Sequence, residues 1–104
     1  MNTDKLFEAL SEPNRRSILE YLRMRDRSVG ELVELSSLSQ PGVSKHLRIL
    51  REAGLVTVRS DAQKRMYGLN AKPLEQLDDW LGPYRRFWSG KLDDLERFLD
   101  EEEP

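Results

Sequence analysis

The chain contains no cysteine and a single histidine, His46. Without cysteine it can form neither disulfides nor thiolate metal sites. No run of apolar residues is longer than two, so we expect no membrane span and no signal peptide, and we expect a cytoplasmic protein. No Ser/His/Asp set, glycine-rich phosphate loop or metal-water site is visible, which argues against an enzyme. The length of 104 residues predicts one domain, residues 1–104.

The most informative segment that is present, SQPGVSKHLRILREAGLV, predicts a helix over residues 39–54. Val43, Leu47 and Leu50 recur at spacings of four and three, so they lie on one face that can pack against a core. Ser39 suits an N-cap, and Gly54 suits the left-handed residue that ends a helix.

The opposite face of this helix has the chemistry of a DNA-reading surface. Amide and hydroxyl groups can pair with base edges in the major groove, and cations can bind phosphates. An ordinary amphipathic surface helix also has basic residues outward, so the pattern alone favours DNA only modestly. The side chains expected to face DNA are Gln40, Ser44, Lys45 and Arg48.

A second, shorter helix is predicted just upstream. Ser28 and Glu31 fit a capping box, and Leu32 and Leu35 are expected to point inward. The connection to the basic helix, residues 36–38, has the length used in a helix-turn-helix, although it lacks the glycine often found there.

Residues 55–70 predict a β-hairpin. Val56 and Val58 alternate with polar residues, residues 61–64 form the turn, and the strand pattern resumes at Met66. A helix-turn-helix followed by a hairpin is a winged helix-turn-helix, so the fold class is mainly α with a small β-hairpin. The hairpin, or wing, can touch the DNA backbone beside the recognition helix through Arg59, Lys64 and Arg65.

The sequence resembles the ArsR-type (ArsR/SmtB) bacterial winged-helix repressors over nearly its whole length. Residues 10–19, LSEPNRRSIL, are similar to the family's opening "L-x-(D/E)-P-x-R-x-x-I-L", and the similarity continues through the recognition helix and the wing, which ends at Tyr67-Gly68-Leu69. The resemblance implies a homodimeric repressor that binds an imperfect inverted repeat in a promoter, often its own. It also implies that the residues named above on the recognition helix and wing contact the DNA. The wing tip departs from the family pattern because residues 61–64 contain no glycine.

Metal sensing of the kinds common in this family is not expected. Residues 28–32 contain no cysteine, and the C-terminal region contains no histidine, so we predict no metal and no cofactor. The chain resembles the subgroup without the usual metal ligands. His46 is predicted to be structural or to contact a phosphate.

The net charge of −2 is unevenly distributed. Residues 39–67 contain six basic and two acidic side chains, a net charge of +4, whereas residues 71–104 contain five basic and ten acidic ones, a net charge of −5. Phosphate affinity depends on the local patch more than on the total charge. The basic part coincides with the predicted reading head.

A long apolar stripe follows the wing. From Leu74 to Leu99 the spacings of three and four keep one helical phase, which predicts a dimerisation helix over residues 71–101, capped at Asn70 and either kinked or broken at Gly82-Pro83. The stripe could instead cover the protein's own core, but its later part is too long for that. We therefore expect a homodimer formed by the N- and C-terminal helices, with Leu6, Phe7, Leu10, Tyr84, Phe87, Trp88, Leu92, Leu95 and Phe98 at the interface.

One alternative function remains open from the sequence. A winged helix can also serve as a protein-protein interaction module without specific DNA binding. The basic side chains of the recognition helix and wing favour DNA. The operator, the regulated genes and any inducer cannot be named from the residues.

Overall fold

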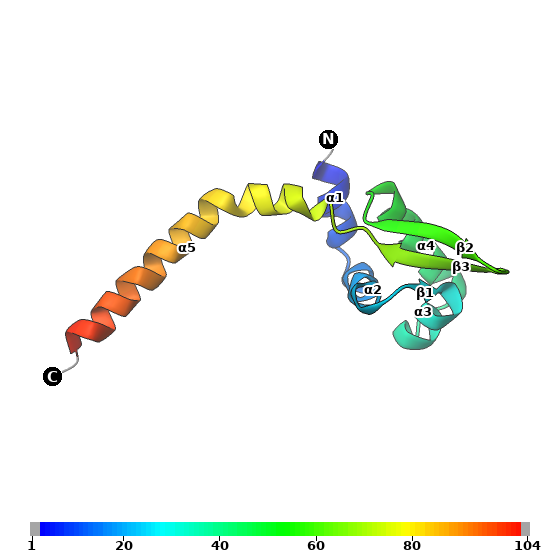
Figure 1. Cartoon of the computed structure of the whole chain (residues 1–104), viewed down its shortest axis with the longest axis horizontal. Helices are drawn as coiled ribbons and strands as arrows, with labels where there is room; N and C mark the ends of the chain where they lie inside the picture. Colours follow the sequence, from blue (N-terminus) through cyan, green and yellow to red (C-terminus); the bar gives the residue numbers. More distant parts are fainter. Residues whose placement is uncertain (1–2, 103–104) are drawn as a thin grey trace. The chain divides into compact units, whose positions relative to one another are not determined.

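The computed structural model describes residues 3–102, without the side chains of Lys91, Leu92 and Glu102. The chain divides into two compact units, one up to Leu74 and the second from Glu75 on. In chain order the elements are α1 (Thr3–Leu10), α2 (Pro13–Met24), β1 (Arg27–Ser28), α3 (Val29–Ser36), α4 (Gln40–Glu52), β2 (Val56–Asp61), β3 (Lys64–Leu69) and α5 (Leu74–Glu102) (Figure 1).

Helices α3 and α4 form the expected helix-turn-helix, and their ends are set by local signals. The Ser28 hydroxyl accepts from the Glu31 amide at 3.2 Å, and the Glu31 carboxylate accepts from the Ser28 amide at 3.4 Å, which completes the capping box. The Ser39 hydroxyl accepts from the Gly42 amide at 3.2 Å at the start of α4. Gly54, with φ of +79°, follows its end. These predictions are confirmed.

The turn between the two helices also has a left-handed residue. Ser37 has φ of +61°, and its amide donates to the Val33 carbonyl at 3.0 Å, which closes the last turn of α3. In this connection a serine therefore takes the left-handed conformation that glycine adopts more easily than other residues do.

The hairpin is confirmed and belongs to a larger sheet. Strands β2 and β3 pair antiparallel from Val56–Leu69 to Asp61–Lys64. The short strand β1 pairs with the other edge of β3, so the sheet has three strands in the order β1-β3-β2. Figure 1 shows the tip of the hairpin extending away from the helices. The sequence did not predict β1, because two residues carry no alternation of their own.

The core lies in the first unit. Helix α2 contacts α1, α3, α4 and β3, and α4 also contacts α1, α3 and β2. The buried apolar side chains of this core are Leu6, Ala9, Ile18, Leu19, Leu22, Leu32, Val43, Leu47, Leu50, Leu55, Val56 and Tyr67.

Two expectations about burial are corrected. Leu35, expected to point inward, is 43% exposed, because the eight-residue helix α3 buries fully only Leu32 and Leu35 lies in its last turn. Leu6, expected at a dimer interface, is 2% exposed and belongs to the core. It therefore has no surface to offer a second copy of the chain.

Helix α5 runs from Leu74 to Glu102 with Pro83 inside it. The structure thus has one continuous helix at Gly82-Pro83, and Figure 1 shows that it is curved. It begins later than the expected residue 71, because Pro73 disfavours helical geometry at Lys72. Asn70 is not its cap: its side-chain Nδ2 donates to the Gly54 carbonyl at 2.9 Å, and its Oδ1 accepts from the Lys72 amide at 3.3 Å. Within residues 3–102, no helix has the length and apolar character of a membrane span.

Candidate nucleic-acid interface

Helix α4 separates its side chains into faces with different surroundings. Val43, Leu47 and Leu50 are buried and fix the helix against the core. The side chains expected to read DNA all lie on the exposed side of the helix: Gln40, Ser44, Lys45 and Arg48. Because burial on one face determines the orientation of the whole helix, these four groups are presented together to solvent.

The basic side chains of α4 are only weakly engaged within the chain. Arg48 lies 3.8 Å from Glu52 one turn later, and both side chains are more than half exposed. Arg48, Arg51 and Glu52 line one shallow recess on this helix. An exposed ion pair at this separation contributes little to stability, so a phosphate can replace the carboxylate at small cost.

The wing presents Lys64 and Arg65 beside the start of α3. Both side chains are exposed and line a recess together with Ser28, Val29 and Gly30. The first amides of a helix carry a partial positive charge. This end of the wing is therefore electropositive, as expected for contact with a DNA backbone.

The wing tip is a two-residue turn at Ala62 and Gln63, between the paired residues Asp61 and Lys64. Ala62 has φ of +56°, a conformation that glycine adopts more easily than alanine. The absence of glycine therefore leaves the tight hairpin intact and places a strained alanine at its tip.

Arg59, the third basic residue expected on the wing, is paired within the chain. Its Nε donates to Oδ2 of Asp26 at 3.2 Å, and its Nη1 lies 3.8 Å from Oδ2 of Asp61. The Arg59 side chain remains 57% exposed. The structure thus assigns Arg59 two acidic neighbours that a phosphate would have to compete with.

His46 lies on a third side of α4 and faces other helices. Its side chain is 16% exposed, with Nδ1 3.4 Å from Nη1 of Arg15 and Nε2 3.8 Å from Oε2 of Glu12. Of the two roles predicted for His46, this environment supports the structural one. The sequence reasoning missed Arg15, although the signal was present: Arg15 falls in phase with Ile18, Leu19 and Leu22 on the buried face of α2.

The Glu31 carboxylate, in the first turn of α3, has both hydrogen-bonding and cationic neighbours. The hydrogen bond from the Ser28 amide, together with Arg25 2.8 Å away, holds the pKa of the Glu31 carboxyl below its ordinary value. Arg27 lies 3.8 Å from the same carboxylate. Glu31 therefore stays ionised and secures the first helix of the helix-turn-helix.

The residues expected at a dimer interface lie on α1 and α5. On α1, Phe7 is 38% exposed and Leu10 is half-buried. On α5 the large apolar side chains of the stripe from Tyr84 onward are about half exposed or more, whereas the earlier leucines are partly buried. The side chain of Leu92 lies outside the described residues. The exposed members of the expected set are Tyr84, Phe87, Trp88, Leu95 and Phe98.

Among the described residues, no three His, Cys, Asp or Glu side chains converge in a way that could hold a metal ion. The acidic pairs 78–79 and 93–94 lie on exposed turns of α5. The groups gathered on α4 and the wing are instead hydrogen-bonding and cationic, which is chemistry for binding a polyanion.

Comparison with known proteins agrees with this geometry. The family model described as "Bacterial regulatory protein, arsR family" matches residues 12–58. The transcriptional repressor SdpR of Bacillus subtilis is 33% identical over 78 residues, which cover 75% of this chain and 87% of the repressor. The HTH-type transcriptional regulator Rv2034 of Mycobacterium tuberculosis is 35% identical over 99 residues, 95% of this chain and 90% of the relative. Among solved structures, an ArsR-like transcriptional regulator from Rhodococcus sp. RHA1 matches with a TM-score of 0.76 and 25% identity, over 97% of this chain and 93% of that one.

Proposed function

The chain belongs to the ArsR family of bacterial regulatory proteins, and from this premise we propose that it acts as a homodimeric repressor on an inverted-repeat operator, including one in its own promoter. It is a DNA-binding transcriptional regulator and not an enzyme, since the family model and the named relatives are transcriptional regulators. A regulator of this kind acts in the cytoplasm, on the bacterial nucleoid.

One observation carries the proposal: the buried face of α4 fixes the helix so that its hydrogen-bonding and cationic side chains face solvent together. We assign base-edge and phosphate contacts in the major groove to this face. Contacts to the neighbouring backbone are assigned to the wing. The proposed DNA-binding residues are Gln40, Ser44, Lys45, Arg48, Arg59, Lys64 and Arg65.

The homodimer is supported by the apolar side chains of α5. Tyr84, Trp88, Leu95 and Phe98 are each about half exposed, which is unusual for a series of large apolar side chains on one helix. In a two-fold dimer these side chains would be covered by their counterparts. Two recognition helices about 34 Å apart would then reach successive major grooves of an inverted repeat, and the bound dimer would block the polymerase.

Gel-shift titration and footprinting on the DNA upstream of the protein's own gene test the proposal. The expected result is a protected inverted repeat whose affinity falls steeply with salt concentration. Substituting Lys45→Ala and Arg48→Ala together should weaken binding by at least about tenfold. It should also reduce the slope of log K against log salt by about 0.9 for each phosphate that the variant no longer neutralises.

Arg23→Ala is the matched control. It removes one exposed cation, compared with two in the double variant, and it does so on α2, where Arg23 pairs with Glu20. Its DNA affinity should stay within about twofold of the parent, since that cation lies outside the proposed interface. Binding that shows no sequence preference, or an equal loss in the control, would contradict the proposal.

A further inference from the structure

Arg15 is the charged residue that the structure counts among the buried side chains of the described chain, with 9% exposure. It occupies the apolar side of α2, in phase with Ile18 and Leu22. A buried cation is unfavourable unless its donors are satisfied, so the partners of Arg15 determine what it does in the fold.

The donors of Arg15 reach two other helices. Nε donates to the Ala9 carbonyl at 2.8 Å and Nη2 donates to the Glu8 carbonyl at 3.0 Å, both in the last turn of α1. Carbonyls at a helix C-terminus lack partners within the helix and carry a partial negative charge, which suits a guanidinium. Nη1 lies 3.4 Å from Nδ1 of His46 on α4. One side chain of α2 therefore joins the end of α1 to the middle of α4.

The chemistry of the two side chains gives this contact its direction. A guanidinium can only donate, so the 3.4 Å contact is a hydrogen bond in the His46 tautomer whose Nδ1 accepts. Nε2 lies 3.8 Å from Oε2 of Glu12, and the same oxygen accepts from the Arg15 amide at 3.1 Å as the N-cap of α2. The direct contact between α2 and α4 is thus the one from Arg15 to His46, and the Glu12 carboxylate lies close to the other ring nitrogen.

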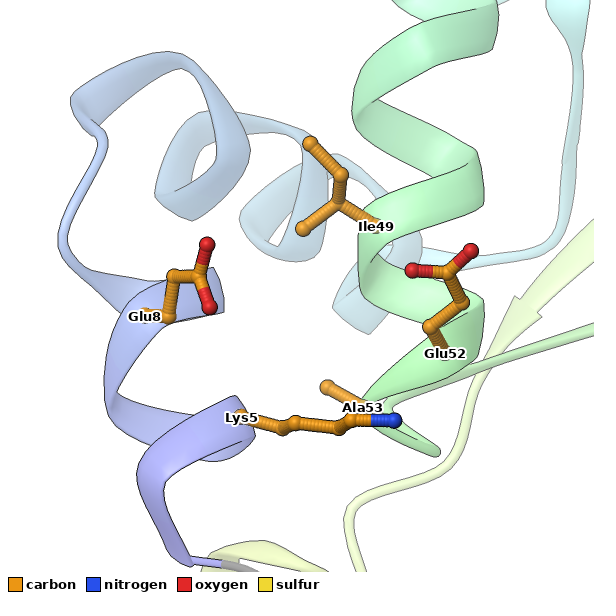
Figure 2. A pocket seen from close by; sticks show the side chains of 5 residues that line it. All are labelled: Lys5, Glu8, Ile49, Glu52 and Ala53. Carbon is orange, nitrogen blue, oxygen red and sulfur yellow. The ribbon is translucent and has the colours of Figure 1, made fainter.

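His46 shares its side of α4 with Ile49 and Ala53, at spacings of three and four. Figure 2 shows Ile49 and Ala53 facing Lys5 and Glu8 of α1 across a small recess. This flank is distinct from the buried face and from the face proposed to read DNA. Its neighbours are parts of α1 and the start of α2.

We propose that Arg15 and His46 are positioning residues that hold the recognition helix α4 at a fixed orientation relative to α1. The inference rests on the proposed homodimer and inverted-repeat operator, because α1 carries Phe7 and Leu10, two of the residues expected at the dimer interface. Neither side chain needs to touch DNA. By fixing α4 relative to α1, the link sets the distance and angle between the two recognition helices of the dimer, and therefore the half-site spacing that the dimer accepts.

The test compares two DNA duplexes and measures their affinities by fluorescence anisotropy. The first is the inverted repeat recovered by selection from random-sequence DNA with the wild-type protein, and the second has one base pair inserted between its half-sites. The insertion displaces one half-site along and around the duplex. Wild-type protein should bind the second duplex at least about tenfold more weakly than the first.

Two substitutions at His46 test the contact with Arg15 separately from the other effects of changing the side chain. His46→Leu removes the acceptor for Arg15, and we expect its affinities for the two duplexes to lie within about threefold of each other, mainly through weaker binding to the first. His46→Asn places an amide oxygen near the position of Nδ1, and it should restore most of the wild-type preference. Arg15→Gln should behave like His46→Leu wherever circular dichroism shows it to be folded.

Arg16→Gln is the control. Arg16 is the next residue on α2 and also donates to α1, from Nη1 to the Leu10 carbonyl at 2.7 Å, but its side chain is exposed to solvent. It should keep the wild-type preference between the duplexes.

The possible failures are distinguishable. If the wild-type protein forms no dimer, or binds both duplexes equally well, the proposed function is wrong and this inference fails with it. Measurements on the wild-type protein alone reveal that outcome. A folded His46→Leu variant that keeps the wild-type affinity ratio overturns the inference alone. A His46→Leu variant that binds both duplexes more weakly by the same factor also overturns the inference, because it indicates a merely structural role.

Discussion

Arg59 on β2 donates from Nε to Oδ2 of Asp26 at 3.2 Å, across the strand that lies between them. Asp26 directly precedes β1, and the sheet order β1-β3-β2 places β3 in the middle. Gly68 on β3 makes the crossing possible, since a β-carbon there would lie 2.8 Å from Oδ1 of Asp26. The glycine in Tyr67-Gly68-Leu69 therefore leaves room for the carboxylate that neutralises Arg59.

This ion pair predicts that Asp26→Asn strengthens DNA binding. Removing the carboxylate frees the Arg59 guanidinium for a phosphate and raises the local positive charge, so we expect affinity to increase about three- to tenfold. In an Arg59→Gln background the same substitution should have little effect. Fluorescence anisotropy on the four proteins of this double-mutant cycle measures the coupling.

Glu20→Gln is the control for charge alone, because it neutralises a carboxylate that pairs with Arg23 on the exposed side of α2. Its DNA affinity should remain near that of the wild type. If Asp26→Asn weakens binding, the carboxylate orients Arg59 toward DNA, and competition between Asp26 and a phosphate is ruled out.

Ser37 makes the turn between α3 and α4 a site where stability can be gained. Its φ of +61° disfavours residues with a β-carbon, so Ser37→Gly should raise the free energy of unfolding by about 0.5–1 kcal/mol. Ser37→Val should lower it by about 1–2 kcal/mol. Urea unfolding of the three proteins measures both effects, and a Ser37→Gly protein that is less stable than the parent would show that the hydroxyl matters more than the backbone.

The parts of the fold that the sequence predicted are those with local causes. Ser28 and Ser39 cap the helices that follow them, and Gly54 ends α4, because each needs only its nearest neighbours along the chain. The face of α4 followed equally from the spacing of Val43 and Leu47. For the same reason, the exposed side of α4 was predictable from its buried side.

The parts that were missed depend on residues far apart in the sequence. Strand β1 exists because Arg27 pairs with Tyr67, forty residues later, and nothing in its two residues indicates a strand. The side-chain hydrogen bond between Arg15 and His46 also joins two separate helices. Its only sequence signal is an arginine on an apolar helix face, which the pattern alone does not connect to a partner.

The capping box predicts a stability change in acid. Because the pKa of Glu31 is lowered in the folded state, its carboxylate contributes stability above the ordinary pKa of 4.5, and this contribution is lost as the pH falls through the folded-state value. Glu31→Gln keeps an acceptor at this position but does not titrate. The stability difference between wild type and Glu31→Gln should therefore be largest near neutral pH and shrink in acid.

Urea unfolding of both proteins from about pH 7 to about pH 3 measures this difference. A difference in the free energy of unfolding that stays constant over this pH range would show that the Glu31 charge contributes nothing beyond its hydrogen bonds.

The apolar side chains of α5 predict that dimerisation can be removed without unfolding the first unit. Leu95 and Phe98 are 53% and 55% exposed, so placing a charge there should cost little in a monomer but should oppose burial against a second copy. Leu95→Glu with Phe98→Glu should give monomers, and operator affinity should fall at least about a hundredfold because two linked half-sites become independent.

Arg97→Glu is the matched control, since it adds the same residue on the same turns of α5 but at a side chain that pairs with Asp94 away from the stripe. It should remain a dimer in analytical ultracentrifugation across the same concentrations as the wild type. Circular dichroism should show that all three proteins are folded. Tight operator binding by a proven Leu95→Glu, Phe98→Glu monomer would mean that one recognition helix and one wing supply the affinity, and the dimer would then have no role in recognition.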